Sequence, residues 1–119
     1  GGRWQQALSL LRGLMKDSLQ PTVVSYGATM SACGKGRQWR WALALLGEMR
    51  LRRLPRNVIV YSAAMSACEK DQRWREALGL MSEMAEEGLE FDIVAYGAGV
   101  SACEKAQEWE QASQLLEQL

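Results

Sequence analysis

Apolar positions recur along this chain with the spacing of helix faces. Between residues 23 and 33 they lie three or four positions apart, as they do on one face of a helix, and a second stripe of this kind occupies residues 39–49. A short polar joint, 34–37, separates the two stripes, and a turn follows at 54–56. The pattern therefore predicts helix, turn, helix, turn. The stripes consist of Val23, Tyr26, Met30, Cys33, Trp39, Ala42, Leu43, Leu46 and Met49.

The same pattern returns every 35 residues. The segment YGATMSACGK at 26–35 is followed by YSAAMSACEK at 61–70 and by YGAGVSACEK at 96–105. Phased from Val23, the chain contains two full units, 23–57 and 58–92, with the tail of an earlier unit in 1–22 and the front of a later one in 93–119. We therefore expect residues 1–119 to form a single repeat array that is a fragment of a longer one.

A single helix pair cannot bury both of its apolar stripes, whereas stacked pairs can. The period therefore predicts an all-α fold, a right-handed α-solenoid of helix–turn–helix repeats. The small side chains of Ala63, Ala64 and Ala67 predict close approach between neighbouring helices.

Composition narrows the function classes. Apolar residues make up 48% of the chain, which argues against disorder, and no apolar run approaches the length of a membrane helix. There are three cysteines, no histidine, no nucleophile motif and no pair of residues at metal-ligand spacing. We therefore expect no catalysis, no cofactor, no metal and no membrane partner. On the apolar face, Cys33, Cys68 and Cys103 are expected to be small buried hydrophobes, too far apart for disulfides.

Tryptophans follow the same period. Trp4, Trp39, Trp74 and Trp109 start the second helical stripe, so they are predicted to pack in the core. Trp41 breaks the period and is predicted to lie at the surface, where it is the better candidate for an external contact.

Charge is divided unevenly between the halves of the chain. Residues 1–57 hold 10 basic and 2 acidic residues, and residues 58–119 hold 4 basic and 12 acidic ones. Phosphate attraction is therefore expected to be weak in the second half. The imbalance is explained if these charged residues lie on helix faces exposed to solvent. Opposite charge in the two halves would also favour end-to-end self-association of arrays.

The 35-residue helix pair resembles the pentatricopeptide repeat. The tetratricopeptide repeat is the nearest alternative, but it has 34 residues and carries its tryptophan in the first helix, not the second. The family pattern is matched in order by Val58-Ile59-Val60-Tyr61-Ser62, Lys70, Ala77-Leu78, Leu80, Met84 and the segment 88–92.

This resemblance implies single-stranded RNA as the partner, with one base per repeat read by two or three side chains. It also implies a mitochondrial or plastid location and a role in RNA processing or stability. The fifth and last residues of each repeat would read the base, the second would wedge against it, and a lysine would meet phosphate. Carried over, base reading falls to Thr22, Gly27, Asn57, Ser62, Asp92 and Gly97, the wedges are Val24, Ile59 and Val94, and the phosphate contacts are Lys35, Lys70 and Lys105.

Several of these residues have a second interpretation. Thr22, Asn57 and Asp92 immediately precede helical stripes and are preferred N-cap types, so capping alone would explain them. The three lysines stand near helix C-termini, where the helix dipole favours positive charge. Glycine at 27 and 97 offers no side-chain donor or acceptor. A protein-interaction scaffold that has lost the base-reading residues is therefore the alternative function.

Overall fold

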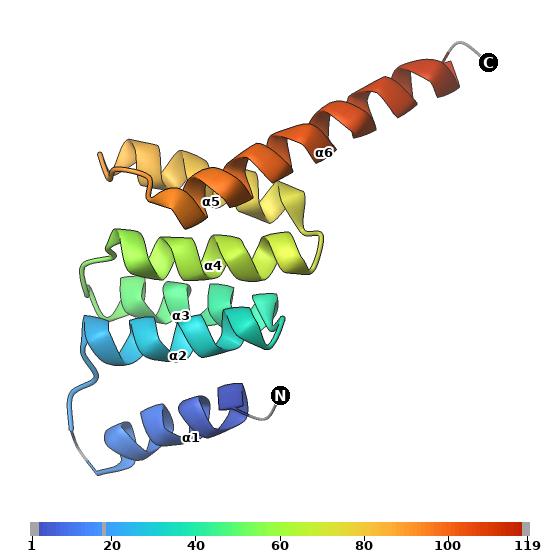
Figure 1. Ribbon diagram of the computed structural model, residues 1–119. Helices are drawn as coiled ribbons and strands as arrows, with labels where there is room; N and C mark the ends of the chain where they lie inside the picture. The colour runs from blue at the N-terminus through green and yellow to red at the C-terminus, as the bar shows by residue number, and fades with distance from the viewer. Residues whose placement is uncertain (1–2, 18, 118–119) are drawn as a thin grey trace.

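The computed structural model describes residues 3–17 and 19–117, with side chains described up to Glu110 apart from that of Trp109. Helices α2, α4 and α6 form one layer of a stack, and α3 and α5 form a second layer behind them (Figure 1). Helix α3 contacts α2 and α4, and α5 contacts α4 and α6. The expected all-α solenoid is confirmed. The helices are α1 Arg3–Lys16, α2 Val23–Lys35, α3 Trp39–Leu51, α4 Val58–Lys70, α5 Trp74–Glu86 and α6 Ile93–Glu117.

Left-handed residues end the helices where the polar joints and turns were expected. Arg37 and Gln72, which are 35 positions apart, have φ values of 57° and 60° after α2 and α4. Arg53 and Gly88 take the same role after α3 and α5, with φ values of 57° and 73°. After α2, the amide of Gln38 donates to the carbonyl of Cys33 at 2.8 Å, and equivalent bonds close the other three turns. This is the Schellman pattern, which satisfies the last helical carbonyls and reverses the chain.

Helix α6 departs from the repeat pattern. It runs without a break from Ile93 to Glu117, through the position at which the repeat predicts a joint, and it extends away from the stack (Figure 1). Position 106 is alanine, whereas the two joints that do form have Gly36 and Asp71 there. Because alanine has the highest helix propensity and glycine and aspartate have low ones, the local sequence favours continuation of α6.

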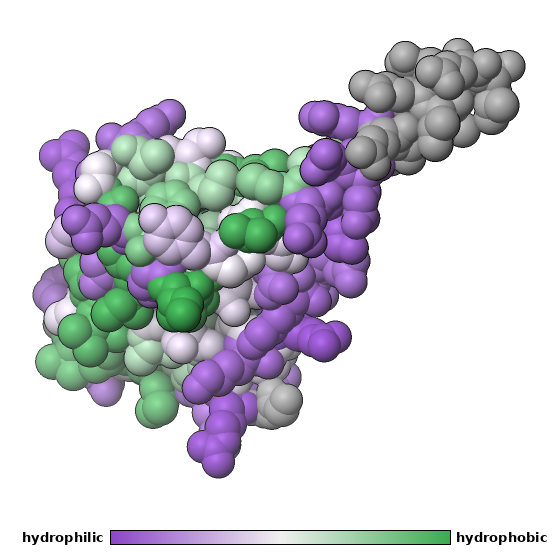
Figure 2. Space-filling view, turned by 45° about the horizontal axis from the view of Figure 1, so that its top comes forward, coloured by the Kyte–Doolittle hydropathy of each residue, from purple (hydrophilic) through white to green (hydrophobic). Residues whose placement is uncertain are grey.

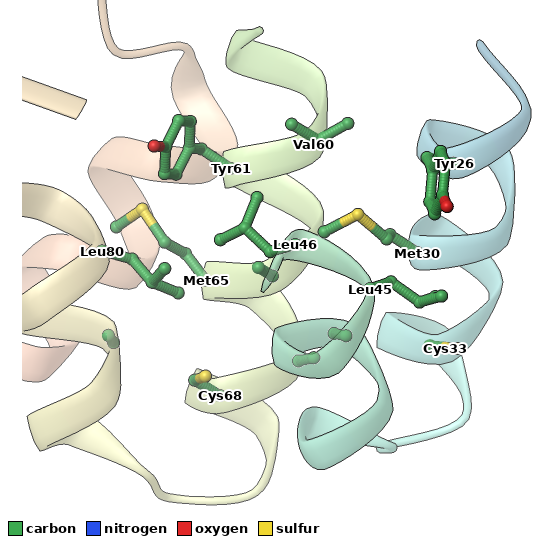
Figure 3. Close-up of a cluster of buried hydrophobic side chains, with 14 of the residues drawn as sticks. Tyr26, Met30, Cys33, Leu45, Leu46, Val60, Tyr61, Met65, Cys68 and Leu80 are labelled. Atoms are coloured by element: carbon green, nitrogen blue, oxygen red, sulfur yellow. The ribbon is translucent and has the colours of Figure 1, made fainter. Parts of the chain in front are cut away.

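The core consists of repeated slots. Tyr26, Met30 and Cys33 line one face of α2, and their equivalents line α4 in the same order (Figure 3). The six side chains are all 0% exposed. Close helix approach is confirmed as well, because a Cβ placed on Gly34 would lie 3.1 Å from the carbonyl oxygen of Ala63.

Three of the periodic tryptophans, Trp4, Trp39 and Trp74, pack against this core and are half-buried. Trp4 lies so close to Gly36 that a Cβ there would come within 2.4 Å of its ring. Trp41 is 40% exposed, as its break from the period predicts. The predicted burial of Trp109 lies outside the described side chains.

The prediction for the cysteines is right for Cys33 and Cys68 and wrong for Cys103, which is exposed. Cys33 lies on α2, which contacts α1 and α3, and Cys68 lies on α4, which contacts α3 and α5, whereas among the described helices α6 has only α5 as such a neighbour. Burial raises the pKa of Cys33, and it raises that of Cys68 to about 12.

Thiol labelling should therefore be selective. We expect a thiol reagent at a pH near 8 to modify Cys103 at once and Cys33 and Cys68 only after unfolding, because the thiolate is the reactive form. Mass spectrometry of the labelled peptides measures this. Rapid labelling of Cys68 in the folded protein would contradict the packing described here.

Ion pairs between successive repeats account for part of the charge imbalance. Arg12 on α1 bonds Glu48 on α3 at 2.8 Å, and Arg56 bonds Glu87 at 2.6 Å. Arg50 on α3 pairs with Glu83 on α5. In each case a basic residue meets an acidic residue that lies 31 to 36 positions further along the chain. Two of these pairs, Arg50–Glu83 and Arg56–Glu87, join the basic first half to the acidic second half within one molecule, whereas Arg12–Glu48 lies within the first half.

Among the described residues, no helix combines the length and apolarity needed to cross a membrane.

Candidate nucleic-acid interface

Each predicted last-position residue caps a helix of the front layer. Thr22 Oγ1 accepts a hydrogen bond from the amide of Ser25 at 3.2 Å, and Asn57 Oδ1 accepts one from Val60 at 3.0 Å. Thr22 also forms the reciprocal half of a capping box, since its amide donates to Ser25 Oγ. Asp92 Oδ1 accepts from the amide three residues on, that of Ala95, at 2.8 Å. The capping interpretation is therefore confirmed for all three residues.

Asp92 has a second bond that capping does not require. The Ser62 hydroxyl donates to Asp92 Oδ1 at 2.6 Å, across 30 residues of sequence. Ser62 is only 5% exposed, so its hydroxyl is fixed by this bond. The fifth and last residues of the unit 58–92 are thereby held together. Among the described residues, Asp92 Oδ2 accepts no hydrogen bond.

A hollow opens beside this pair between helices α2, α4 and α6. Its volume is about 290 Å³. Ile59 and Val94, two of the predicted wedges, come from successive units, and two of the predicted phosphate ligands, Lys35 and Lys70, also line it. Six of the predicted residues thus surround one cavity. We call this cavity the Ser62–Asp92 hollow, and it is lined by Ser31, Gly34, Lys35, Ile59, Ser62, Ala63, Ser66, Lys70, Asp92 and Val94.

The remaining predicted residues are not gathered there. Gly27 lies on α2 where an added Cβ would contact Val60 at 3.6 Å and Ile59 at 3.8 Å, so the equivalent position in the unit 23–57 faces α4. Val24 is 80% exposed on the first turn of α2. Gly97 has nothing within 4 Å of an added Cβ.

Lys105 lines a separate hollow of about 240 Å³ with Ser101 and Trp74. It also forms an ion pair with Glu108 at 3.6 Å.

Two kinds of surface meet on the layer formed by α2, α4 and α6. Hydrophobic side chains gather toward the side where α2 and α4 begin, and hydrophilic ones form a band along the other side (Figure 2). The exposed wedges Val24, Ile59 and Val94 belong to the helix starts, and Lys35 and Lys70 to the helix ends. A ligand with an apolar flat part and an anionic part would match this division.

Sequence reasoning missed four polar or small residues of the Ser62–Asp92 hollow, namely Ser31, Gly34, Ala63 and Ser66. A signal was available, because serine recurs at 31, 66 and 101 with the 35-residue period. This signal is hard to recognise because other small residues surround each of these serines, and no feature of the sequence indicates that the serine faces a cavity.

Among the described residues, no group of histidine, cysteine, aspartate and glutamate could hold a metal ion.

The capping bond of Asn57 can be tested through the stability of the protein. We expect Asn57→Ala to lower the free energy of unfolding by about 1 kcal/mol, because the Val60 amide loses its partner. Asn57→Asp should leave stability nearly unchanged, since the carboxylate can accept the same bond. Urea unfolding followed by circular dichroism measures both. Equal losses in the two variants would show that the bond to Val60 contributes little.

The sequence and the fold both have counterparts among known proteins. The family model described as "Pentatricopeptide repeat domain" matches residues 9–71, more than half of the chain. The chain belongs to the pentatricopeptide repeat family. A second model of the family, described as "PPR repeat", matches residues 59–89. Comparison with curated proteins gave no significant match.

Solved structures of this family share the fold. The pentatricopeptide repeat protein PPR10 from maize aligns with a TM-score of 0.74 and 29% identity over 98% of this chain. PPR10 in complex with an 18-nt psaJ RNA element aligns with a TM-score of 0.73 and 29% identity over 85% of it. The chain spans only 17% and 15% of those proteins, respectively.

Proposed function

We propose that this pentatricopeptide repeat chain binds single-stranded RNA along the layer formed by α2, α4 and α6, and that it selects bases without catalysing a reaction. The observation that carries the proposal is the Ser62–Asp92 hollow, where two wedges, a fixed polar pair and two lysines surround one cavity. Ile59 and Val94 would hold a base between them, and Lys35 and Lys70 would contact phosphate. The PPR10 complex with an RNA element, which has the same fold, supports this assignment.

The hydrogen bonds of the polar pair favour guanine in this hollow. The Ser62 hydroxyl donates its only proton to Asp92 Oδ1. Toward a ligand, the Ser62 oxygen and Asp92 Oδ2 can therefore act only as hydrogen-bond acceptors. Guanine has two adjacent donors, N1–H and N2–H, on its Watson–Crick edge. Adenine and cytosine each place a donor beside an acceptor, and uracil has one donor between two acceptors. The pair therefore complements guanine better than the other three bases.

The wider role that we propose is support of RNA processing or stability in a mitochondrion or plastid, which rests on the family alone. A scaffold for protein partners remains the second candidate. It is favoured by Gly27 and Gly97, which bring no polar side chain to the fifth position of their units, and by the excess of acidic residues after residue 57.

Fluorescence anisotropy tests the proposal directly. The 119-residue chain would be titrated into short labelled single-stranded RNA of random sequence, with duplex RNA and single-stranded DNA as controls, at several salt concentrations. We expect saturable preference for single-stranded RNA. The slope of log affinity against log salt is negative, and it should become shallower by about 0.7 for each of Lys35→Ala and Lys70→Ala, since each removed phosphate contact reduces counterion release by that amount.

If the chain is a protein-interaction scaffold that does not read RNA, we expect no preference for single-stranded RNA. Equal binding to all three nucleic acids, with slopes that the lysine substitutions leave unchanged, would overturn the RNA proposal. Circular dichroism of each variant establishes that the helices are intact.

A new base contact can be designed at Gly27. An added Cβ would have ordinary van der Waals contacts there, so Gly27→Ser should fold normally. By repeat equivalence, the new hydroxyl would lie toward Asn57 as Ser62 lies toward Asp92. We expect base selectivity to appear at the nucleotide next to the guanine, measured by competition among RNAs varied at that position. Gly47→Ser, which adds the same hydroxyl on α3, should change nothing.

A further inference from the structure

A row of polar side chains runs along α4 through the Ser62–Asp92 hollow. Ser62, Ser66 and Lys70 are four residues apart, and all three line the hollow. Because four residues of helix rise about 6 Å, these side chains follow one another along one wall at intervals of about one turn. Ser62 belongs to the first half of α4 and Lys70 is its last residue, so Ser66 lies midway between the base-reading pair and the lysine.

The serine and the lysine of this row recur in the neighbouring units. On α2, Ser31 precedes Lys35 by the same four residues, and both line the Ser62–Asp92 hollow. On α6, Ser101 and Lys105 line the adjacent hollow together. A serine one turn before the lysine therefore faces a hollow in all three units, including the two whose fifth residue is glycine. Its recurrence follows the lysine and not the base-reading residue.

The hydroxyl of Ser66 is available to a ligand. Serine and threonine in helices can bond the carbonyl four residues earlier, as Thr29 does with that of Ser25 at 2.8 Å. The hydroxyl of Ser62 is held by Asp92. Ser66 is half-buried, and its hydroxyl forms no hydrogen bond with the described part of the chain. It therefore presents both a donor and an acceptor to the hollow.

The order of these groups matches the order of the parts of a nucleotide. In the binding mode proposed above, the base contacts Ser62 and Asp92, and Lys70 contacts phosphate. Ribose joins base to phosphate, so it would pass the middle of the wall, where Ser66 lies. The 2′-hydroxyl of ribose is a donor and an acceptor, as the serine hydroxyl is, and it is the group by which a protein distinguishes RNA from DNA.

We propose that Ser66 binds the 2′-hydroxyl of the nucleotide whose base occupies the Ser62–Asp92 hollow, and that it thereby selects ribose over deoxyribose. This inference rests on the RNA binding proposed above, but it concerns the sugar and not the base. Ser62 and Asp92 would determine which base is bound, and Ser66 would determine which sugar. The two selectivities should therefore be separable by substitution.

A double-mutant cycle between protein and RNA tests this assignment. One ligand is a run of uridines that contains a single guanosine, and the second differs only in carrying 2′-deoxyguanosine at that position. The wild-type chain should bind the deoxy ligand about two- to tenfold more weakly, which corresponds to the loss of one hydrogen bond. Ser66→Ala should bind both ligands equally and should keep its preference for guanine over adenine. Competition followed by fluorescence anisotropy measures all of these ratios.

Ser82→Ala is the matched control. It removes the hydroxyl of an exposed serine on α5, outside the Ser62–Asp92 hollow, so the weaker binding of the deoxy ligand should persist in it. Alanine is favoured in helices, so both variants should fold, and circular dichroism checks this.

The outcomes separate this inference from the function on which it rests. Equal binding of the two ligands by the wild-type chain, with its guanine preference intact, would overturn the role of Ser66 and leave RNA binding in place. A loss on deoxy substitution that persists in Ser66→Ala would also overturn it, because the serine would then only keep the hollow open. Absence of any preference for single-stranded RNA would overturn the proposed function and this inference together.

Discussion

Asp92→Asn should shift the base preference of the Ser62–Asp92 hollow from guanine to adenine. The amide oxygen can retain the bonds from Ala95 and Ser62, which places an NH₂ donor where Oδ2 now offers an acceptor. A donor at that point opposes N1–H of guanine and complements N1 of adenine. Because a paired set of base-edge hydrogen bonds discriminates by ~1–3 kcal/mol, we expect the ratio of the two affinities to change by about tenfold or more. Competition between otherwise identical RNAs measures it.

Glu90→Gln is the matched control for this change. It removes the same charge from an exposed side chain two residues away, outside the Ser62–Asp92 hollow. It should reduce affinity for all sequences equally or not at all. If Asp92→Asn behaved like Glu90→Gln, Asp92 would act as a cap alone. Stability data distinguish that case from misfolding, since asparagine is also a preferred N-cap.

Tyr61→Ala should be among the most destabilising single substitutions in the chain. The ring is 0% exposed on α4, and its hydroxyl accepts from Arg56 Nε at 3.2 Å and donates to Glu87 at 3.1 Å. Removing a buried aromatic side chain leaves a cavity and costs about 3–5 kcal/mol. The loss of the two polar contacts adds to this. We expect a large fall in the urea midpoint with a nearly unchanged m-value.

The repeat provides the control for this prediction. Tyr96→Ala alters the same position of the pattern on α6, where the ring is 61% exposed and contacts Phe91 at 5.4 Å between centroids. It should cost under about 1 kcal/mol, because little apolar area leaves water at this site. Equal losses at the two positions would contradict the burial described here.

Helix positions followed from the sequence because they depend on local chemistry. The apolar spacing predicted stripes beginning at Val23 and Trp39, where α2 and α3 begin, and the polar joints coincide with left-handed turns. The caps at Thr22, Asn57 and Asp92 could also be predicted, since a cap needs only a suitable side chain within three residues of an amide. Even the continuity of α6 has a local cause in Ala106.

Burial and the composition of the candidate site were decided by the tertiary structure. Identical patterns place Cys68 in the core and Cys103 at the surface, because α4 contacts both α3 and α5, whereas among the described helices α6 has only α5 as such a neighbour. The Ser62–Asp92 bond spans 30 residues, and Lys35 reaches the same hollow from the preceding unit. The sequence by itself determined which residues repeat and which helices they form, since both follow from contacts a few residues apart. Only the stacking of helices determined which repeats are covered and which side chains share a cavity, since both depend on neighbours distant in the chain.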